Sequence, residues 1–506
     1  MTIDIGLGMA TNAQASPAAR RSAHWLAIAA VFATAAWLRL VIPFNVDVSW
    51  WLTVSERMLD GQRLYVDILE TNPPMPLAIY CLSVVLARAT GIRPEVVVDG
   101  LIFVLIAASL AWTWHILRSA SLRGRAAAGA LAVFAAVLLT ILPMYDFGQR
   151  EHLATVAILP AIGVYILRGN HERVTMAAIV IAGVSAAVTM GFKPYFACAV
   201  GVCSLAAALL ARDWRVLFAL ENWIAAALTA AYGVGVLVFY PEYFTIIYPL
   251  VRDVYLLLQA PLLAIFATTA TALSVGAAMI VLILQRREGE RDVVSVVVLA
   301  AALGFAMAFF LQHKGWGYHA YPMVAFALMA VGCAIAAVDP ERAGSRRWRA
   351  AAILAVAAML ARACWWFDGG VDVRKIEERV ARLAPHPKIL MLSAAPSFGF
   401  PMVRTLQGTW VSRQEALWVR EIVRRARRDQ IIDQETGDRL QTHVERERAG
   451  LVEDFRKQRP DVVLIDNRDS DWGRWAQADP ELSMLLKSYA PVSTIDGVDI
   501  LERRAP

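Results

Sequence analysis

The stretch that follows the first long apolar run of this sequence is unusually rich in acids. Residues 45–74 read NVDVSWWLTVSERMLDGQRLYVDILETNPP and contain Asp47, Asp67 and Glu70. A carboxylate can take the proton of an attacking hydroxyl group, and Asp47 is our candidate for such a general base. Asp67 and Glu70 are candidates for binding a substrate, with capping of the Pro-Pro turn as the alternative interpretation.

A second polar stretch, MYDFGQREH at 144–152, crowds charged groups into a turn that needs none of them. Arg150 suits a phosphate or a partnership with Asp47, and a salt-bridged turn is the alternative. Glu151 and His152 could join Asp47 around a divalent cation, but their spacing matches no metal-binding motif. We assign no metal ligand, and the candidate substrate-binding residues here are Asp146, Arg150, Glu151 and His152.

Basic and aromatic residues recur in three later polar stretches. Lys193 lies in GFKPYF, where it is either a phosphate ligand or a cation reaching toward the membrane surface. Arg252 has the same two interpretations as a lipid-phosphate contact or a partner of Asp253. In QHKGWGYHAYP at 312–322, two glycines let the backbone approach a ligand closely, with an interfacial aromatic belt as the alternative. The candidate binding residues of that stretch are His313, Lys314, Tyr318 and His319.

Long apolar runs separate these polar stretches. Of the 506 residues, 58% are hydrophobic and 18% are charged, which is little charge for a soluble protein of this length. About eleven runs are long and apolar enough to span a membrane. We expect spanning helices near 22–43, 97–117, 126–143, 153–168, 174–191, 195–211, 216–239, 261–284, 293–311, 321–338 and 349–366.

The arginines give these spans an orientation. With the N-terminus in the cytoplasm, every inner segment is basic, as the positive-inside rule requires, provided that the run at 74–91 does not cross. That run is short and begins with prolines, so we expect a helix at the outer interface, and a second one over SWWLTVSERMLDG. Membrane orientation therefore explains the net charge of +6, and no nucleic-acid partner is expected.

The sequence divides into three parts. Residues 1–21 are expected to form a cytoplasmic tail, and 22–367 a transmembrane domain whose first outer loop is 44–96. Residues 368–506 are charged and turn-rich. Strand-like runs at 388–394, 461–466, 491–496 and 498–503 predict a small extracytoplasmic α/β domain.

The acid after the first helix and the segment GQRLYVDILETNPP at 61–74 resemble the C-type glycosyltransferase superfamily (GT-C). The resemblance is strongest to the branch that contains protein O-mannosyltransferases and lipid A aminoarabinose transferases. Asp47 stands where this family has its first-loop catalytic aspartate, and 61–74 matches the family's G-x-x-x-Y-x-D segment followed by Pro-Pro. The chain differs in having a single acid after the first helix where the family usually has a pair, so the family's metal site is not carried over.

The resemblance implies an inverting membrane glycosyltransferase that moves a sugar from a polyprenyl-phosphate donor to an acceptor hydroxyl, with Asp47 as base. Phosphate ligands would be drawn from Arg150, Lys193, Arg252 and Lys314. Membrane lipids are expected partners, while the acceptor (glycan, lipid or protein) and a divalent cation stay open.

The implied location is the bacterial-type inner membrane, in which the chain is a multi-pass protein with its C-terminal domain outside the cytoplasm. Two alternatives are a transporter or flippase of lipid-linked sugars and a non-catalytic subunit of a polysaccharide assembly system.

Overall fold

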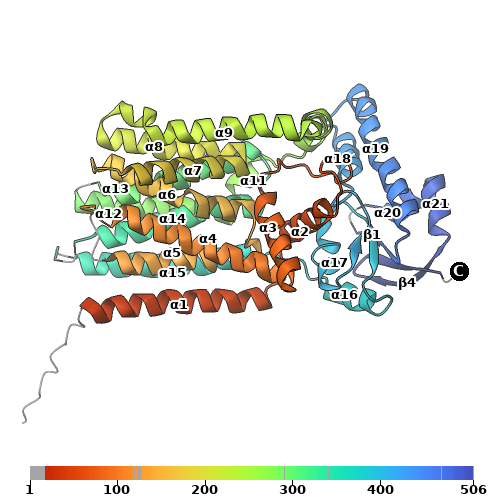
Figure 1. The fold of residues 1–506 in the computed structure, drawn as a ribbon, viewed down its shortest axis with the longest axis horizontal. Coiled ribbons are helices and arrows are strands. Elements are labelled where there is room, and N and C mark those ends of the chain that lie inside the picture. The colour runs from red at the N-terminus through yellow and green to blue at the C-terminus, as the bar shows by residue number, and fades with distance from the viewer. Residues whose placement is uncertain are drawn as a thin grey trace, which may run out of the picture.

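The computed structural model describes residues 17–118, 120–122, 127–289, 291–339, 341–342, 344–468 and 470–504. A helical bundle occupies one part of the molecule, and a mixed domain covers one end of it (Figure 1). Among the described residues, nine helical segments are long and apolar enough to cross a membrane, so the chain is an integral membrane protein. These are built on α1 (Pro17–Val41), α4 (Pro94–Leu117), α6 (Arg150–Gly169), α8 (Ala197–Ala211), α9 (Leu220–Phe239), α12 (Thr269–Glu288), α13 (Val293–Gln312), α14 (Tyr321–Ala337) and α15 (Ser345–Phe367).

Two further apolar helices of the bundle, α5 (Ala128–Thr140) and α7 (Met176–Phe192), are shorter than these nine. They correspond to the remaining two of the roughly eleven spans expected from the sequence. The expected span at 261–284 is interrupted. The short helix α11 (Leu262–Phe266) ends, and the Thr268 side chain then caps α12 by accepting a hydrogen bond from the Thr271 N–H.

Helices α6 and α14 form the centre of the bundle. Of the apolar stretch of α6, 89% is buried inside the protein, whereas only 6% of that of α1 is buried. Helix α1 therefore lies at the edge, as Figure 1 shows. The polar residues at the start of α6 are consequently held in the most enclosed part of one bundle end.

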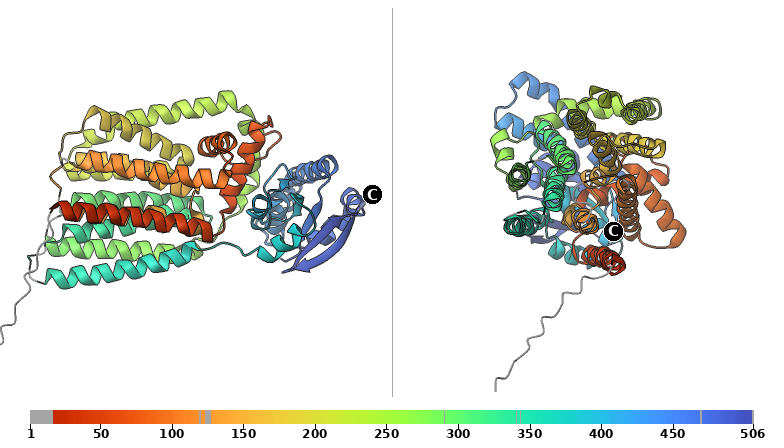
Figure 2. Two further views of the ribbon diagram at one scale, coloured as in Figure 1. Left: turned by 60° about the horizontal axis from the view of Figure 1, so that its bottom comes forward. Right: turned by 90° about the vertical axis from the view of Figure 1, so that its left-hand side faces the viewer.

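Helices α2 (Val46–Leu59) and α3 (Leu77–Thr90) lie at the end of the bundle and do not run along its length as the spanning helices do (Figures 1 and 2). The Asn45 side chain begins α2 by accepting a hydrogen bond from the Val48 N–H. Residues on all sides of α2 are buried, including both Trp50 and Trp51, because the C-terminal domain covers the face that the bundle does not. The sequence had predicted this helix over SWWLTVSERMLDG.

The C-terminal domain is built on a five-stranded sheet with the order β2-β1-β3-β5-β4. The first three strands in this order are parallel, and β5 and β4 continue the sheet as an antiparallel hairpin. The strands are β1 (Lys388–Leu392), β2 (Thr409–Trp410), β3 (Val462–Asp466), β4 (Tyr489–Ile495) and β5 (Val498–Arg503), and the helices are α16 (Arg374–Ala381), α17 (Met402–Thr405), α18 (Trp418–Arg428), α19 (Gln434–Gln458), α20 (Trp472–Ala478) and α21 (Pro480–Leu486). The two-residue strand β2 is the one that the sequence did not predict.

The segment between α9 and α12 connects the bundle to this domain. It contains the π-helical turn Tyr243–Ile247, α10 (Tyr248–Asp253) and the 3-10 turn Tyr255–Leu257. Val254 packs in an apolar cluster with residues of α18 and α19, and the ring of Tyr255 contacts that of Trp418. The domain therefore rests on two separate outer segments of the membrane part.

Close packing of α13 on α8 depends on one glycine. A Cβ atom at Gly304 would lie 2.4 Å from the Cα atom of Ala199, so no side chain fits there without separating the helices. Small residues at such crossings allow the backbones of membrane helices to approach closely.

We predict that Gly304→Ala destabilises the protein by about 1–3 kcal/mol, the usual cost of overpacking. Thermal unfolding of the purified protein in detergent measures this effect. Gly233→Ala on α9 is the control, because a Cβ atom there meets nothing within 4 Å. Equal melting temperatures for the two variants would contradict the proposed packing.

Candidate active site at the end of the bundle

Two helix starts meet at Asp47. Gln149 immediately precedes α6, and its Nε2 donates hydrogen bonds to Asp47 Oδ2 at 2.9 Å and to Asn45 Oδ1 at 3.0 Å. Asn45 in turn donates through Nδ2 to the backbone oxygen of Tyr145 at 3.0 Å. The carboxylate is thus held in the first turn of α2, where the partial positive charge of the helix N-terminus stabilises a negative charge.

The environment of Asp47 suits a proton acceptor. Burial raises the pKa of its carboxyl group, while Arg150 and the hydrogen bond from Gln149 act in the opposite direction. The side chain is only half-buried, so it keeps contact with the space outside the protein. A base with a raised pKa that a substrate can reach is better matched to proton transfer near neutral pH than an ordinary aspartate.

Glu70 holds the turn that positions Arg150. Its Oε2 accepts a hydrogen bond from Trp50 Nε1 at 2.6 Å, and its Oε1 accepts from Asn72 N at 2.8 Å and Asn72 Nδ2 at 2.6 Å. Asn72 then accepts a hydrogen bond from Arg150 Nη1, and the guanidinium lies 5.6 Å from the centre of the Trp51 ring. Arg150 is therefore fixed from the same loop that carries Asp47.

A buried lysine lies beside Asp47 and Arg150. Lys193 Nζ donates to Glu151 Oε1 and, at 3.0 Å, to Gln312 Oε1, and it lies 2.9 Å from His319 Nε2. Burial lowers the pKa of Lys193 to about 8, against the opposing effect of Glu151. Since the ammonium donates to His319 Nε2, the proton of that ring is on Nδ1. Tyr318 completes the cluster, with its ring centre 5.7 Å from Nζ.

Several buried atoms of this cluster have no hydrogen-bond partner among the described residues. Two of them are donors, Arg150 Nε and His319 Nδ1, and two are acceptors, Gln149 Oε1 and Glu151 Oε2. An unsatisfied buried polar atom costs about 1–3 kcal/mol, so such atoms normally have a partner. Donors and acceptors together match a ligand that carries both an anionic group and hydroxyl groups.

Some residues predicted from the sequence lie outside the cluster. Asp67 is exposed and accepts a hydrogen bond from the Arg63 N–H through Oδ2 at 2.8 Å, so it caps its own turn. Arg252 is paired with Asp253 at 2.8 Å on an exposed surface. Arg252 thus has the Asp253 partner that the sequence offered as its alternative, whereas Asp67 caps the turn at 63–67 and not the Pro-Pro turn.

The stretch at 312–322 divides between the cluster and its support. Tyr318 and His319 face Lys193, but Lys314 Nζ donates to the backbone oxygens of Tyr255 at 2.9 Å and Leu258 at 2.6 Å. His313 ends α13 in a left-handed conformation, and its carbonyl accepts from the Ala260 N–H at 2.7 Å. Lys314 and His313 therefore hold the outer segment near residues 255–260.

Asp146 and His152 of the turn at 144–152 are both enclosed in the protein. Asp146 is buried, and burial, together with the nearby charges of Glu151 and Asp47, raises its pKa well above the usual value. His152 accepts from the Gly148 N–H at 3.0 Å through Nδ1 and lies 2.7 Å from Leu139 O through Nε2. Both of its nitrogens are used inside the protein. Among the described residues, no group of three His, Cys, Asp or Glu side chains could hold a metal ion.

The sequence pointed to charged residues and passed over the amides that orient them. Asn45, Asn72 and Gln312 each contact a charged or capping side chain of the site. No local pattern distinguishes these amides from ordinary surface ones. Only the quoted TNPP motif, which contains Asn72, carried a signal.

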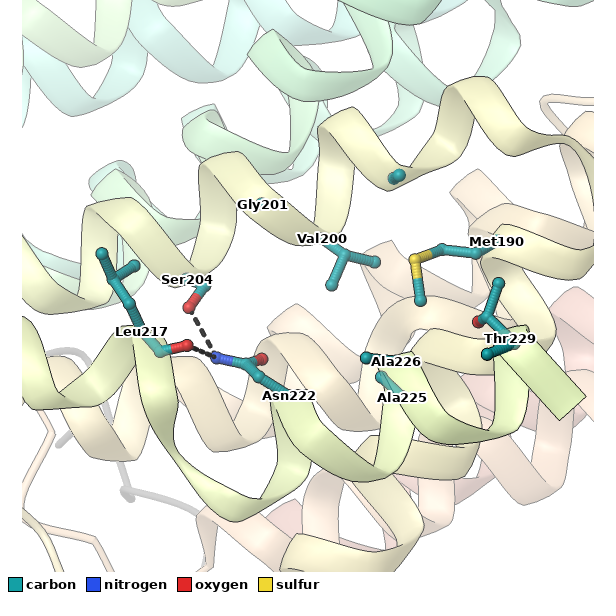
Figure 3. A pocket seen from close by; sticks show the side chains of 11 residues that line it. Met190, Val200, Gly201, Ser204, Leu217, Asn222, Ala225, Ala226 and Thr229 are labelled. Carbon is teal, nitrogen blue, oxygen red and sulfur yellow. Dashed lines mark hydrogen bonds between the residues drawn. The ribbon is translucent and has the colours of Figure 1, made fainter.

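A groove lies along the bundle between α7, α8 and α9 (Figure 3). It has a volume of about 570 Å³ and small side chains on both walls, such as Gly201 and Ala226, with Ser204 and Asn222 joined by a 2.9 Å hydrogen bond toward one end. Met190, at the other end, belongs to the last turn of α7, which leads directly to Lys193. An apolar groove with small side chains on its walls has room for a lipid chain.

The C-terminal domain is fastened to the first outer loop by a buried arginine. Arg404 Nη1 and Nη2 donate to the two carboxylate oxygens of Glu56 at 2.8 and 2.9 Å, and Nε donates to Glu95 at 2.6 Å. Only 8% of the Arg404 side chain is exposed. Its loss would leave two acids facing each other in a partly buried interface.

The comparisons with known proteins agree with this architecture. No protein-family profile and no curated protein matches the chain. A crystal structure of ArnT from Cupriavidus metallidurans bound to undecaprenyl phosphate superposes with a TM-score of 0.55 over 94% of this chain and 98% of that chain, at 13% sequence identity. The apo crystal structure of the same protein gives a TM-score of 0.54 at 13% identity, over 95% of this chain and 98% of that chain.

This chain has the ArnT fold. The predicted resemblance to the branch with lipid A aminoarabinose transferases is thereby confirmed for the fold, and the predicted class, a polytopic helical protein with a small α/β domain, is confirmed with it. The likeness spans both the bundle and the C-terminal domain, which is why the end-on arrangement of the two belongs to the fold itself.

We predict that Arg404→Ala costs about 3–5 kcal/mol, as expected when one partner of a buried ion pair is removed. It should lower the melting temperature and increase protease cleavage in the segment 368–373 that joins the domain to α15. Arg374→Ala is the matched control, because that side chain is 83% exposed and pairs with Asp372 across a surface turn. A wild-type cleavage pattern in Arg404→Ala would show that the ion pair does not hold the domain.

Proposed function

We propose that the protein is a membrane glycosyltransferase that moves a sugar from a polyprenyl-phosphate donor to an acceptor hydroxyl. The observation that carries this proposal is the half-buried Asp47 carboxylate next to the buried cations Arg150 and Lys193. Sugar transfer from a phosphate needs a base for the attacking hydroxyl and positive charge for the leaving group. Both are present in one cluster at one end of the bundle.

The reaction would proceed in one displacement. Asp47 takes the proton of the acceptor hydroxyl while its oxygen forms a bond to the anomeric carbon of the sugar. The bond between that carbon and the phosphate oxygen breaks, and the electron pair leaves with the polyprenyl phosphate. Attack from the side opposite the leaving group inverts the anomeric configuration. Arg150 and Lys193 stabilise the growing negative charge of the phosphate in a site of low dielectric, where such charges interact strongly.

The lipid part of the donor has a place in the groove between α7, α8 and α9. Its small side chains leave room for a branched isoprenoid chain, and its Met190 end leads toward Lys193. The ArnT structure, which contains undecaprenyl phosphate, supports the choice of a polyprenyl phosphate as the lipid partner.

The site is proposed to face the extracytoplasmic side of a bacterial inner membrane. The inner segments of the predicted topology carry arginines such as Arg212, Arg286 and Arg347, which the positive-inside rule assigns to the cytoplasm. The C-terminal domain and the first outer loop lie at the other end of the bundle (Figure 2). Residues 1–16 of the proposed cytoplasmic tail lie outside the described residues.

The residues near Asp47 do not fit a divalent cation. Glu151 is paired with Lys193, and both nitrogens of His152 have partners inside the protein. A hard cation needs several oxygen ligands around one point, and among the described residues no group of three His, Cys, Asp or Glu side chains provides them. No step of the proposed reaction is routed through a metal ion.

We predict that Asp47→Asn lowers transfer by about 10²–10⁴-fold, the usual contribution of a general base, with the protein still folded. Transfer is measured with purified protein and radiolabelled polyprenyl-phosphate sugars, following the label into the acceptor fraction of membranes. The control is Asp67→Asn, which removes an exposed acid of the same loop.

Each outcome separates the proposed enzyme from its alternatives. Unchanged transfer by Asp47→Asn would remove Asp47 as the base. Movement of labelled lipid across vesicles without chemical transfer, by the wild-type protein, would favour the flippase instead.

We predict a bell-shaped dependence of kcat/KM on pH. Activity rises as Asp47 loses its proton, and this rise comes at a pH above the usual pKa range of aspartate because burial raises the pKa of Asp47. Activity falls near pH 8, where Lys193 loses its charge. Initial rates from pH 4 to 10 measure both limbs.

Lys193→Arg should keep its charge over this pH range, so the alkaline limb should move upward or disappear. An alkaline limb that stays in place in Lys193→Arg would assign it to another group.

A further inference from the structure

The C-terminal domain turns the carboxyl ends of the parallel strands β1 and β2 toward the membrane part. The loops that follow the parallel strands β1 and β2 leave from their carboxyl ends, which is the edge where ligand sites form in such sheets. The loop after β1 brings Phe400 to within 5.7 Å of Trp50, measured between ring centres, and leads to Arg404. The loop after β2 contains residues 411–417 and approaches Glu70.

This second loop pairs directly with the first outer loop. Leu69 and Gln414 form a parallel β-bridge, in which the Leu69 N–H donates to Arg413 O at 2.7 Å. Arg57 Nη1 adds a hydrogen bond to Ser412 O at 2.8 Å. Because the two segments run in parallel, the next residues along each, Glu70 and Glu415, follow side by side.

The loop is also held rigidly within its own domain. Arg413 is bound by Asp454, whose Oδ2 accepts from the Arg413 N–H at 2.8 Å, and Trp410 Nε1 donates to Gln414 O at 2.9 Å. Gln414 Nε2 donates to Glu447 Oε1 at 3.1 Å. Glu415 therefore projects from a segment whose position is determined on both sides.

Glu415 is an acid of this domain that reaches the charges of the site. Its carboxyl group interacts electrostatically with Asp47, Glu70 and Arg150, and burial together with the two acids raises its pKa well above the usual value. Its Oε1 atom is buried and has no hydrogen-bond partner among the described residues. A buried carboxyl oxygen without a partner is costly unless a ligand supplies one.

We propose that Glu415 binds a hydroxyl group of the substrate and that the C-terminal domain thereby completes the active site. This rests on the proposed glycosyl transfer. A hydroxyl group suits the position because it both donates and accepts, whereas a phosphate would be repelled by the neighbouring carboxylates. The hydroxyl belongs either to the sugar of the donor or to the acceptor, and the two sources differ in which binding step depends on Glu415.

The experiment compares Glu415→Ala, Glu415→Asp and Glu415→Gln in the full-length protein in lipid nanodiscs. Binding is measured for polyprenyl phosphate and for polyprenyl-phosphate hexoses, and KM is measured for donor and acceptor in the transfer assay. Glu378→Ala, which removes an exposed acid of the same domain, is the control.

We expect Glu415→Ala and the shorter Glu415→Asp to weaken binding of the sugar-bearing lipid about tenfold, the effect of one hydrogen bond. Binding of polyprenyl phosphate without sugar should not change, and Glu415→Gln should retain most of the affinity. A tenfold rise in KM for the acceptor with unchanged donor binding would assign the hydroxyl to the acceptor and also support the proposal.

Wild-type affinities and KM values in Glu415→Asp would overturn the proposal, and so would an equal loss for both lipids accompanied by a lower melting temperature. Hexose binding by the wild type that depends on Glu415, without transfer, would overturn the proposed reaction but keep Glu415 as a sugar ligand. Normal transfer by Glu415→Ala would keep the proposed reaction but overturn Glu415 as a ligand of the substrate.

Discussion

The need to balance buried charge at one end of the bundle governs this molecule. Glu151 and Lys193 come from different helices and neutralise each other in the interior, where an isolated charge would be prohibitively costly. Asp47 and Arg150 lie next to them. Asp47 accepts a hydrogen bond from Gln149, and Arg150 donates to Asn72, which Glu70 holds in turn. The cluster keeps its charges because hydrogen bonds from amides hold them in place. These charges are what the proposed reaction needs.

The same constraint explains the position of the other elements. Lipid cannot cover a polar bundle end, so α2, α3 and the C-terminal domain cover it instead (Figure 1). Glu56 of α2 and Glu95 of α4 are met by Arg404, and the outer segment near Tyr255 is held by Lys314. Residues with no contact to the proposed substrate thus build the enclosure in which the site operates.

The sequence predicted the parts of the fold that depend on composition and period. Apolar length located the spans, and the run at 74–91 was predicted not to cross because it is short and begins with prolines. The site was predictable only in part, because charged residues signal chemistry but not contact. Lys193 was found from its place at a helix end, whereas the amide partners Asn72 and Gln312 and the distant Glu415 become neighbours only through tertiary packing. Asp67 and Glu70 are both acids of the same short stretch of sequence. Asp67 nevertheless faces outward, because it caps the exposed turn at 63–67 by accepting a hydrogen bond from the Arg63 N–H.

The order of the chain gives the bridge between Leu69 and Gln414 a consequence for biogenesis. The bundle emerges from the ribosome and enters the membrane before the segment around Gln414 has been made. A newly inserted bundle therefore has its acidic loop uncovered, and the enclosure forms only after the last domain has been made and has folded against it. Maturation of the protein ends with a docking step between its earliest outer loop and its latest domain, so a chain that terminates early would reach the membrane but lack the cover over its polar cluster.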